Sequence, residues 1–180
     1  PRRRAWQHGA MSDRELPDPP PSAAWPEVDE VWRFWFDTLD VAGDASPEVA
    51  QRWWTKDAAF DREIGKRFGG VHASVVAGER EAWRADAHGA LAYVIVLDQF
   101  SRNMYRDTPG MFAADEQALA AARDAIVRGL DLALPRAPRA FFYLPLMHSE
   151  ALVDQDECVA LFERLPGAAY NLRFAEKHRD

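Results

Sequence analysis

The chain has 180 residues, which suits one domain, and 48% of them are hydrophobic, including seven Trp and ten Phe. Its 22 basic and 29 acidic residues give a net charge of −7, which disfavours nucleic-acid binding because phosphate recognition needs a basic surface. The single cysteine, Cys158, excludes an intramolecular disulfide, and no apolar run approaches the roughly 20 residues that span a bilayer, so we expect a cytoplasmic protein without a membrane partner.

Residues 1–24 are expected to be a disordered, proline-rich tail. Prolines at positions 17, 19, 20 and 21 exclude a helix, and few apolar residues are present to anchor the segment. Met11 lies inside this tail, and one interpretation is a start at Met11 with residues 1–10 as an upstream extension. Residues 25–180 are then expected to form a single helical domain.

From residue 25 onward, apolar residues recur with the period of a helix. Pro26 suits the first position of a helix with one apolar stripe, and Ser46 is a good start for the next. That first stripe consists of Val28, Val31, Trp32 and Trp35. Thr55 is expected to cap a third helix, which Gly69–Gly70 weakens midway and Gly78 ends.

Residues 90–103 are expected to form the central, buried helix, because the segment is apolar on all sides before its polar end. A strand is the competing interpretation for Leu91–Leu97, which is rich in β-branched and aromatic residues. We prefer a helix because the surrounding segments are helical and the chain offers no strand partner.

Later helix starts are expected at Pro109 with a second start at Asp115, at Pro138, at Asp154 and near Ala168. Pro145 should kink the helix that Pro138 opens, and Asp154 with Glu157 resembles a capping box. About seven helices with short connections predict an all-α fold of antiparallel helix pairs.

Three long motifs, in order and at family spacing, resemble the hallmark segments of the uncharacterised bacterial family DUF924. They are Leu97–Asn103 with Tyr105, Phe112–Asp115 followed by Ala118–Leu119, and Phe141–Glu150 followed by Asp154–Gln155. The resemblance covers residues 25–180 and implies a tetratricopeptide-like α–α superhelix, but it implies no activity. Family members usually continue past a segment like residues 177–180 into a stretch rich in Phe, Gly and Arg, which we expect this chain to lack.

One polar cluster ends the central helix. On a helical period, Asp98, Gln99, Arg102 and Asn103 share one arc, and polar groups at the end of a buried helix are costly unless paired. A structural interpretation makes Asp98 and Arg102 a buried ion pair at i, i+4. In a functional interpretation, Arg102 holds a carboxylate or phosphate and Asp98 orients it or acts as a base.

A second polar cluster follows the apolar run of residues 140–147. It contains His148 and Glu150, with Asp154 and Gln155 just beyond. His148 is either a hydrogen-bonded packing residue or, if the two clusters meet, part of a cleft with two carboxylates and an arginine. The second arrangement would suit acid–base chemistry.

No metal or cofactor is expected. His148 and Glu150 point about 200° apart on a helix, and the sequence has no His-x-x-x-His or Cys-x-x-Cys pair. Three further histidines and Cys158 are expected to be surface or packing residues, and four tryptophans at helical spacing are expected in the core. These residues are His72, His88 and His178, and Trp32, Trp35, Trp53 and Trp54.

The favoured functional hypothesis is a helical module that binds a small acidic ligand or a peptide. The alternatives are an acid–base or metal-assisted hydrolase that uses Asp98, His148 and Glu150, and a polar cluster that is purely structural. The candidate ligand-binding residues are Asp98, Gln99, Arg102, Asn103, His148, Glu150 and Gln155.

Overall fold

The computed structural model of the protein describes residues 25–179, and within this range it contains helices and no β-strand, which confirms the all-α prediction. The expected disordered tail, residues 1–24, lies outside the described residues. The α-helices are α1 (Pro26–Phe36), α2 (Pro47–Trp54), α3 (Ala58–Val76), α4 (Ala87–Ile95), α5 (Ser101–Met104), α6 (Asp115–Val127), α7 (Arg136–His148), α8 (Leu152–Glu163) and α9 (Ala169–Arg179). None of the described helices is both long and apolar enough to cross a bilayer.

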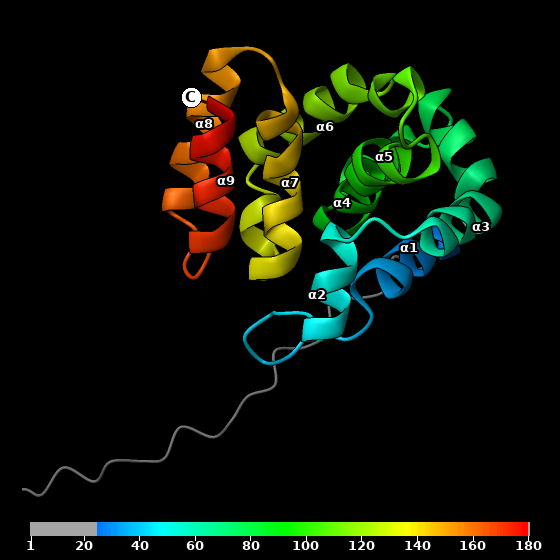
Figure 1. The fold of residues 1–180 in the computed structure, drawn as a ribbon, viewed down its shortest axis with the longest axis horizontal. Helices are drawn as coiled ribbons and strands as arrows, with labels where there is room; N and C mark the ends of the chain where they lie inside the picture. Colours follow the sequence, from blue (N-terminus) through cyan, green and yellow to red (C-terminus); the bar gives the residue numbers. More distant parts are fainter. Residues whose placement is uncertain (1–24, 180) are drawn as a thin grey trace, which may run out of the picture.

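The central helix expected from the sequence is present and lies at the middle of the fold. Helix α4 continues through a π-helical segment, Val96–Phe100, into α5, and every residue from Gly89 to Ser101 is buried. Helix α4 packs against α1, α6 and α7, whereas α3 packs against the π-helical segment and α5. Figure 1 shows the second half of the chain leading away from this centre through α6 and α7, with α8 and α9 on the far side of α7.

An aromatic core joins α1 to both halves of the chain. The Trp35 ring, whose side chain is fully buried, meets Phe100 and Phe141 edge-on, with ring centroids 5.7 and 5.8 Å apart. Such edge-to-face pairs contribute about 0.5–1.5 kcal/mol beyond the area that they bury. Because Phe100 closes the π-helical segment and Phe141 belongs to α7, this contact holds those two elements near each other.

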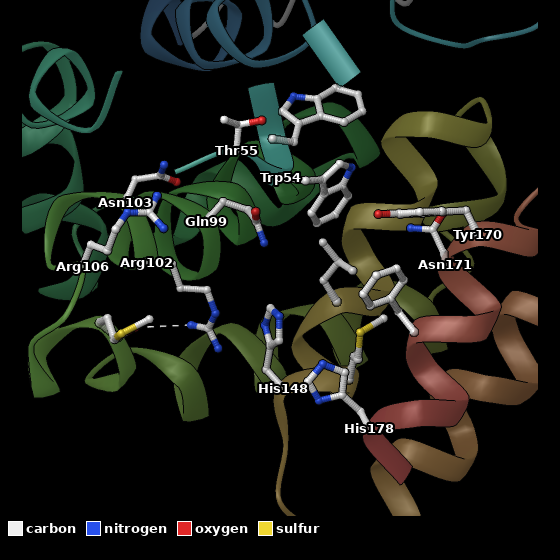
Figure 2. Close-up of a pocket in the computed structure, with 15 residues that line it drawn as sticks. Trp54, Thr55, Gln99, Arg102, Asn103, Arg106, His148, Tyr170, Asn171 and His178 are labelled. Atoms are coloured by element: carbon white, nitrogen blue, oxygen red, sulfur yellow. Dashed lines mark hydrogen bonds between the residues drawn. The ribbon is translucent and has the colours of Figure 1, made fainter. Parts of the chain in front are cut away.

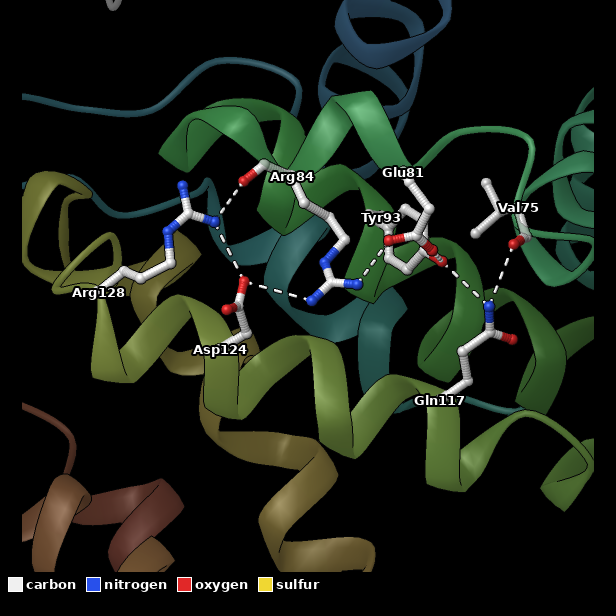
Figure 3. A network of polar contacts seen from close by, with 7 residues as sticks. All are labelled: Val75, Glu81, Arg84, Tyr93, Gln117, Asp124 and Arg128. Carbon is white, nitrogen blue, oxygen red and sulfur yellow. Dashed lines mark hydrogen bonds and ion pairs between the residues drawn. The ribbon is translucent and has the colours of Figure 1, made fainter.

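A polar network on α4 and α6 has a structural role (Figure 3). The Tyr93 hydroxyl donates a hydrogen bond to Glu81 at 2.6 Å and accepts one from Gln117 at 3.0 Å. Burial, together with the hydrogen bond to Glu81, raises the pKa of Tyr93 to about 12. Arg84 lies 3.3 Å from Asp124, so the short 3-10 helix at residues 81–85 is tied to both α4 and α6.

Several helix boundaries differ from those expected. Ser46 caps α2, as expected, because its hydroxyl accepts a hydrogen bond from the Val49 amide. Thr55 was the wrong cap for α3: Asp57 accepts from the amides of Ala59 and Phe60, and the Thr55 hydroxyl donates to a backbone carbonyl instead.

Helix α3 continues without a break through its two adjacent glycines, and Gly78, with φ of +77°, follows its end. Pro109 opens only a short 3-10 helix, whereas Asp115 begins α6 as the second expected start. Helix α7 begins at Arg136, two residues before the expected Pro138, and Pro145 lies inside it.

The capping box expected at Asp154 is also wrong. Helix α8 begins at Leu152, and its N-cap residue, Ala151, has no side-chain cap. Asp154 lies in the first turn and accepts hydrogen bonds from Ser149 and Arg123. Its carboxylate therefore joins the start of α8 to α6.

The closest backbone approach in the centre of the fold predicts opposite effects for two Gly→Ala substitutions. A Cβ at Gly89 would lie 2.1 Å from the Trp83 carbonyl oxygen, whereas a Cβ at Gly69 would meet nothing within 4 Å. We expect Gly89→Ala to lower the free energy of unfolding by roughly 1–3 kcal/mol or more. Gly69→Ala should raise it by roughly 0.5–1 kcal/mol, because alanine has the better helix propensity.

Urea unfolding followed by far-UV circular dichroism measures both changes. Equal stability of the two variants would contradict the close approach at Gly89.

Candidate functional site

A pocket with a volume of about 410 Å³ lies between α5, α7 and α9, with the end of α2 at its rim (Figure 2). Its polar lining consists of Thr55, Gln99, Arg102, Asn103, Arg106, His148, Asn171 and His178. Its apolar and aromatic lining consists of Trp53, Trp54, Met111, Leu144, Met147, Tyr170 and Phe174. The volume falls in the range of small-molecule sites.

A buried carboxylate lies behind the polar lining. Asp98 is only 1% exposed and is surrounded by hydrogen-bond donors from two helical elements. His148 Nδ1 lies 2.8 Å from its Oδ1, Gln99 Nε2 donates to its Oδ2 at 2.6 Å, and Arg102 Nη1 lies 3.5 Å from Oδ1. Burial alone would raise the pKa of Asp98, but the charges and hydrogen bonds of these neighbours hold it below its usual value.

The two arginines of the pocket are each fixed by a carboxylate outside the lining. Arg102 makes a bidentate contact with Asp115 of α6, with distances of 2.7 and 3.1 Å. Arg106 donates from Nε and Nη2 to Asp61 of α3, which also accepts a hydrogen bond from Asn103. The arginine side chains are therefore held in place before any ligand arrives.

The backbone that presents this cluster is π-helical. Asp98 and Gln99 lie within the segment Val96–Phe100, and Arg102 and Asn103 follow in the first turn of α5. A π-helical turn inserts an extra residue into a helix and is frequent at functional sites. The π-helical turn changes the angular spacing of the side chains from that expected for an α-helix. Gln99, Arg102 and Asn103 nevertheless line one pocket.

The structure brings together five of the seven candidate residues. The two polar helix ends meet through the contact between Asp98 and His148, and Asn103 is buried rather than facing bulk water. Glu150, by contrast, is exposed and does not line the pocket. Gln155 also lies outside the lining and donates a hydrogen bond to the Ser149 carbonyl at 2.7 Å, so it braces the turn between α7 and α8.

The sequence interpretation missed the wall that α9 supplies. Tyr170, Asn171, Phe174 and His178 all line the pocket, and His178 is therefore more than the surface or packing residue expected. Burial and the nearby His148 lower the pKa of His178, and the two imidazoles lie close together in the pocket (Figure 2). A partial signal was present, because Tyr170 and Phe174 are aromatic residues at i, i+4 on a helix that is mostly polar.

The tryptophans divide between core and pocket. Trp32 and Trp35 are buried, as expected for core residues. Trp53 is half-buried, and Trp54 is 49% exposed, so the prediction of a core position was wrong for Trp54. Trp54 instead stacks parallel to Phe141, with ring centroids 6.2 Å apart, at the rim of the pocket.

Two further titratable groups outside the pocket, Cys158 and His88, have packing roles. Cys158 is buried, its thiol donates to the Tyr143 carbonyl, and burial raises its pKa to about 12, so it behaves as a small apolar residue. His88 stacks on Trp32, with ring centroids 4.1 Å apart. Within residues 25–179, no three His, Cys, Asp or Glu side chains converge as metal ligands would.

The buried His72 predicts a pH dependence of stability. Its Nε2 lies 2.8 Å from the Ser101 hydroxyl, and burial lowers its pKa below the usual value. The unfolded chain therefore binds this proton more readily, and stability that is present above about pH 6.5 is lost as the pH falls through the folded-state pKa. Chemical denaturation at about pH 7.5 and about pH 5.5 should show a smaller loss of stability on acidification in His72→Gln than in the native chain.

Glutamine keeps a hydrogen-bond partner for Ser101, and the substitution leaves every other titratable residue of the chain in place. A loss of equal size in the two proteins would show that His72 does not carry this dependence.

Comparison with known proteins places the chain among proteins without an assigned activity. The family model described as bacterial protein of unknown function (DUF924) matches residues 31–180. The solved structure of a protein of unknown function from Agrobacterium tumefaciens is similar at 36% sequence identity, with a TM-score of 0.76, and the match covers 86% of this chain and 81% of that one. No curated protein matches.

Proposed function

This chain belongs to the DUF924 family of bacterial proteins, and we propose that its pocket binds a small organic acid with an apolar body. The observation that carries the proposal is the composition of the lining: among the described residues that form it, two are arginines, two are histidines and none is acidic. The whole chain, in contrast, has a net charge of −7. A donor-rich pocket in an acidic protein is suited to a ligand that brings acceptors.

The carboxylates near the pocket support this selectivity. Asp98, Asp115 and Asp61 each accept hydrogen bonds from the arginine or amide side chains that separate them from the pocket. The oxygens of these carboxylates are therefore occupied within the protein. The donor groups that stay free on the arginine side chains are available to a ligand. The Nη1 group of Arg106, for instance, makes no hydrogen bond with another described residue, although Nε and Nη2 do.

The other half of the lining defines the body of the ligand. Trp54, Tyr170 and Phe174 are all at least 41% exposed, which is unusual for large aromatic side chains away from a binding surface. Flat aromatic faces are well suited to a ring or an alkyl chain. A volume of about 410 Å³ favours a small molecule over a peptide segment.

We also propose that the protein is cytoplasmic, because its one cysteine is free and buried.

The polar cluster of the pocket has a second, structural role. Arg106 with Asp61 braces α3 against the end of α5, and Arg102 with Asp115 braces α5 against α6. Tests of ligand binding must therefore use substitutions that preserve these ion pairs.

We expect 3-phenylpropanoate and phenyl phosphate to bind, and the neutral 3-phenylpropanamide to bind more weakly, in isothermal titration calorimetry. Arg102→Lys keeps the charge beside Asp115 but loses the planar fork, and should weaken binding of both anions about tenfold, as expected for the loss of one charge-assisted hydrogen bond. Trp54→Ala should lower the affinity for all three ligands, because it removes apolar contact area at the rim of the pocket.

Arg33→Gln is the matched control, because Arg33 lies on the exposed face of α1 and outside the pocket. Its affinity for the anions should equal that of the native chain. Equal affinity for the acids and the neutral amide would contradict the proposal.

A further inference from the structure

We propose that His148, oriented by Asp98, is the general base of a hydrolytic reaction on a carboxylic ester whose acid part carries a second, anionic group. This inference rests on the proposed function, because the same pocket has to hold the anionic group. His148 would be the catalytic residue, and Asp98 would be a positioning residue that acts through it.

The contacts of Asp98 set the tautomer of His148. Gln99 Nε2 can only donate a hydrogen bond, and it donates to Oδ2 of Asp98. The positively charged guanidinium of Arg102 lies near Oδ1, so the Asp98 carboxylate is ionised and acts as an acceptor. The hydrogen shared between Asp98 Oδ1 and His148 Nδ1 therefore belongs to the imidazole. In the neutral ring, this leaves the lone pair on Nε2.

That Nε2 atom is available to a ligand. The His148 side chain is 19% exposed and lines the pocket, and Nε2 makes no hydrogen bond with any other described residue. The ring lies between Arg102 and His178 (Figure 2). A buried carboxylate that fixes one nitrogen of an imidazole and leaves the other facing a cavity is the arrangement that general-base catalysis requires.

The anion-binding group and the base are close enough for one substrate. Arg102 Nη1 and His148 Nδ1 lie 3.5 and 2.8 Å from the same Oδ1 atom of Asp98, so the two nitrogens are at most about 6.3 Å apart. Nη1 itself donates to Asp115 and to the Met111 carbonyl, whereas Nε of Arg102 makes no hydrogen bond with another described residue and is the donor left for the substrate. An ester whose carboxylate contacts Arg102 would therefore hold its reacting carbonyl, a few bonds away, beside the imidazole.

We assign water as the nucleophile. The Thr55 hydroxyl, which lines the pocket, donates to the Gln51 carbonyl. The Ser101 hydroxyl is bonded to His72, the Ser149 hydroxyl donates to Asp154, and the Cys158 thiol is buried in the core. In the reaction, Nε2 takes a proton from water as the water oxygen bonds to the ester carbonyl carbon. The carbon–oxygen bond to the alcohol then breaks, and the protonated imidazole gives its proton to the departing oxygen, so one water converts the ester into an acid and an alcohol.

The test uses the mono(4-nitrophenyl) ester of succinic acid with the full chain and measures release of 4-nitrophenolate. We expect saturable hydrolysis that 3-phenylpropanoate inhibits competitively. His148→Gln retains a donor to Asp98 and should lower kcat on the order of 100-fold. Asp98→Asn should lower kcat and leave KM within about twofold, because it disturbs the orientation of the base while the bidentate contact with Asp115 still holds Arg102 in place.

A rescue experiment separates catalysis from a structural effect. After subtraction of the hydrolysis that imidazole causes in the absence of protein, added imidazole should restore hydrolysis to His148→Ala, because a free base can occupy the vacated volume, and it should leave the protein-dependent rate of the native chain unchanged. His88→Gln is the matched control, since His88 is a half-buried histidine stacked on Trp32 outside the pocket, and its kinetics should equal those of the native chain.

The outcomes distinguish the two proposals. Binding of 3-phenylpropanoate without hydrolysis of the ester, or hydrolysis that His148→Gln leaves intact, overturns the catalytic role and preserves the binding function. Absence of both binding and hydrolysis overturns the proposed function and this inference together.

Discussion

The structure depends on how one buried charge is satisfied. Asp98 lies almost wholly out of water, and an ionised carboxylate in such a place is costly unless donors surround it. Its donors come from its own helical segment and from the last residue of α7, so its stabilisation requires these two elements to meet in one register. The position of His148, and with it the floor of the pocket, follows from this requirement.

The aromatic core and the polar cluster act on the same pair of elements. Trp35 contacts Phe100 and Phe141, which lie on the inner side of the π-helical segment and α7, while Asp98 and His148 join the two elements farther along. Apolar packing supplies most of the stabilisation, but it is non-directional. Hydrogen bonds to a single carboxylate add the directional constraint that a preorganised site needs.

The sequence was sufficient to predict the fold class, and it raised the meeting of the two polar helix ends as one of two interpretations. Both predictions rest on long, continuous patterns: apolar segments that end in Asp98 and in His148 have to be buried together, and their polar ends then need partners. Glu150 did not follow His148 into the pocket, because α7 ends at His148 and the chain turns outward at the next residues.

The remaining part of the site could not be read from local patterns. Arg102 pairs with Asp115 and Arg106 with Asp61, across 13 and 45 positions of the chain, and such partners depend on how whole helices pack. The contribution of α9 is less predictable still, because Phe174 reaches the pocket only through the packing of α9 on α7 and α8. Trp54 was misplaced because an apolar stripe does not reveal which of its residues lies at the edge of a cavity.

The origin of the pocket walls has a consequence for how the family can diversify. The polar floor is connected to the interior through the hydrogen bonds of Gln99 and His148 to the buried Asp98, so replacement of these residues lowers the stability of the fold. The opposite wall belongs to α9, whose only buried residue is Ala175, and the side chains that it presents are largely free of the interior. Single substitutions on α9 can therefore alter the size and polarity of this wall with little loss of stability. Different ligands can then bind while the polar floor of the pocket stays the same.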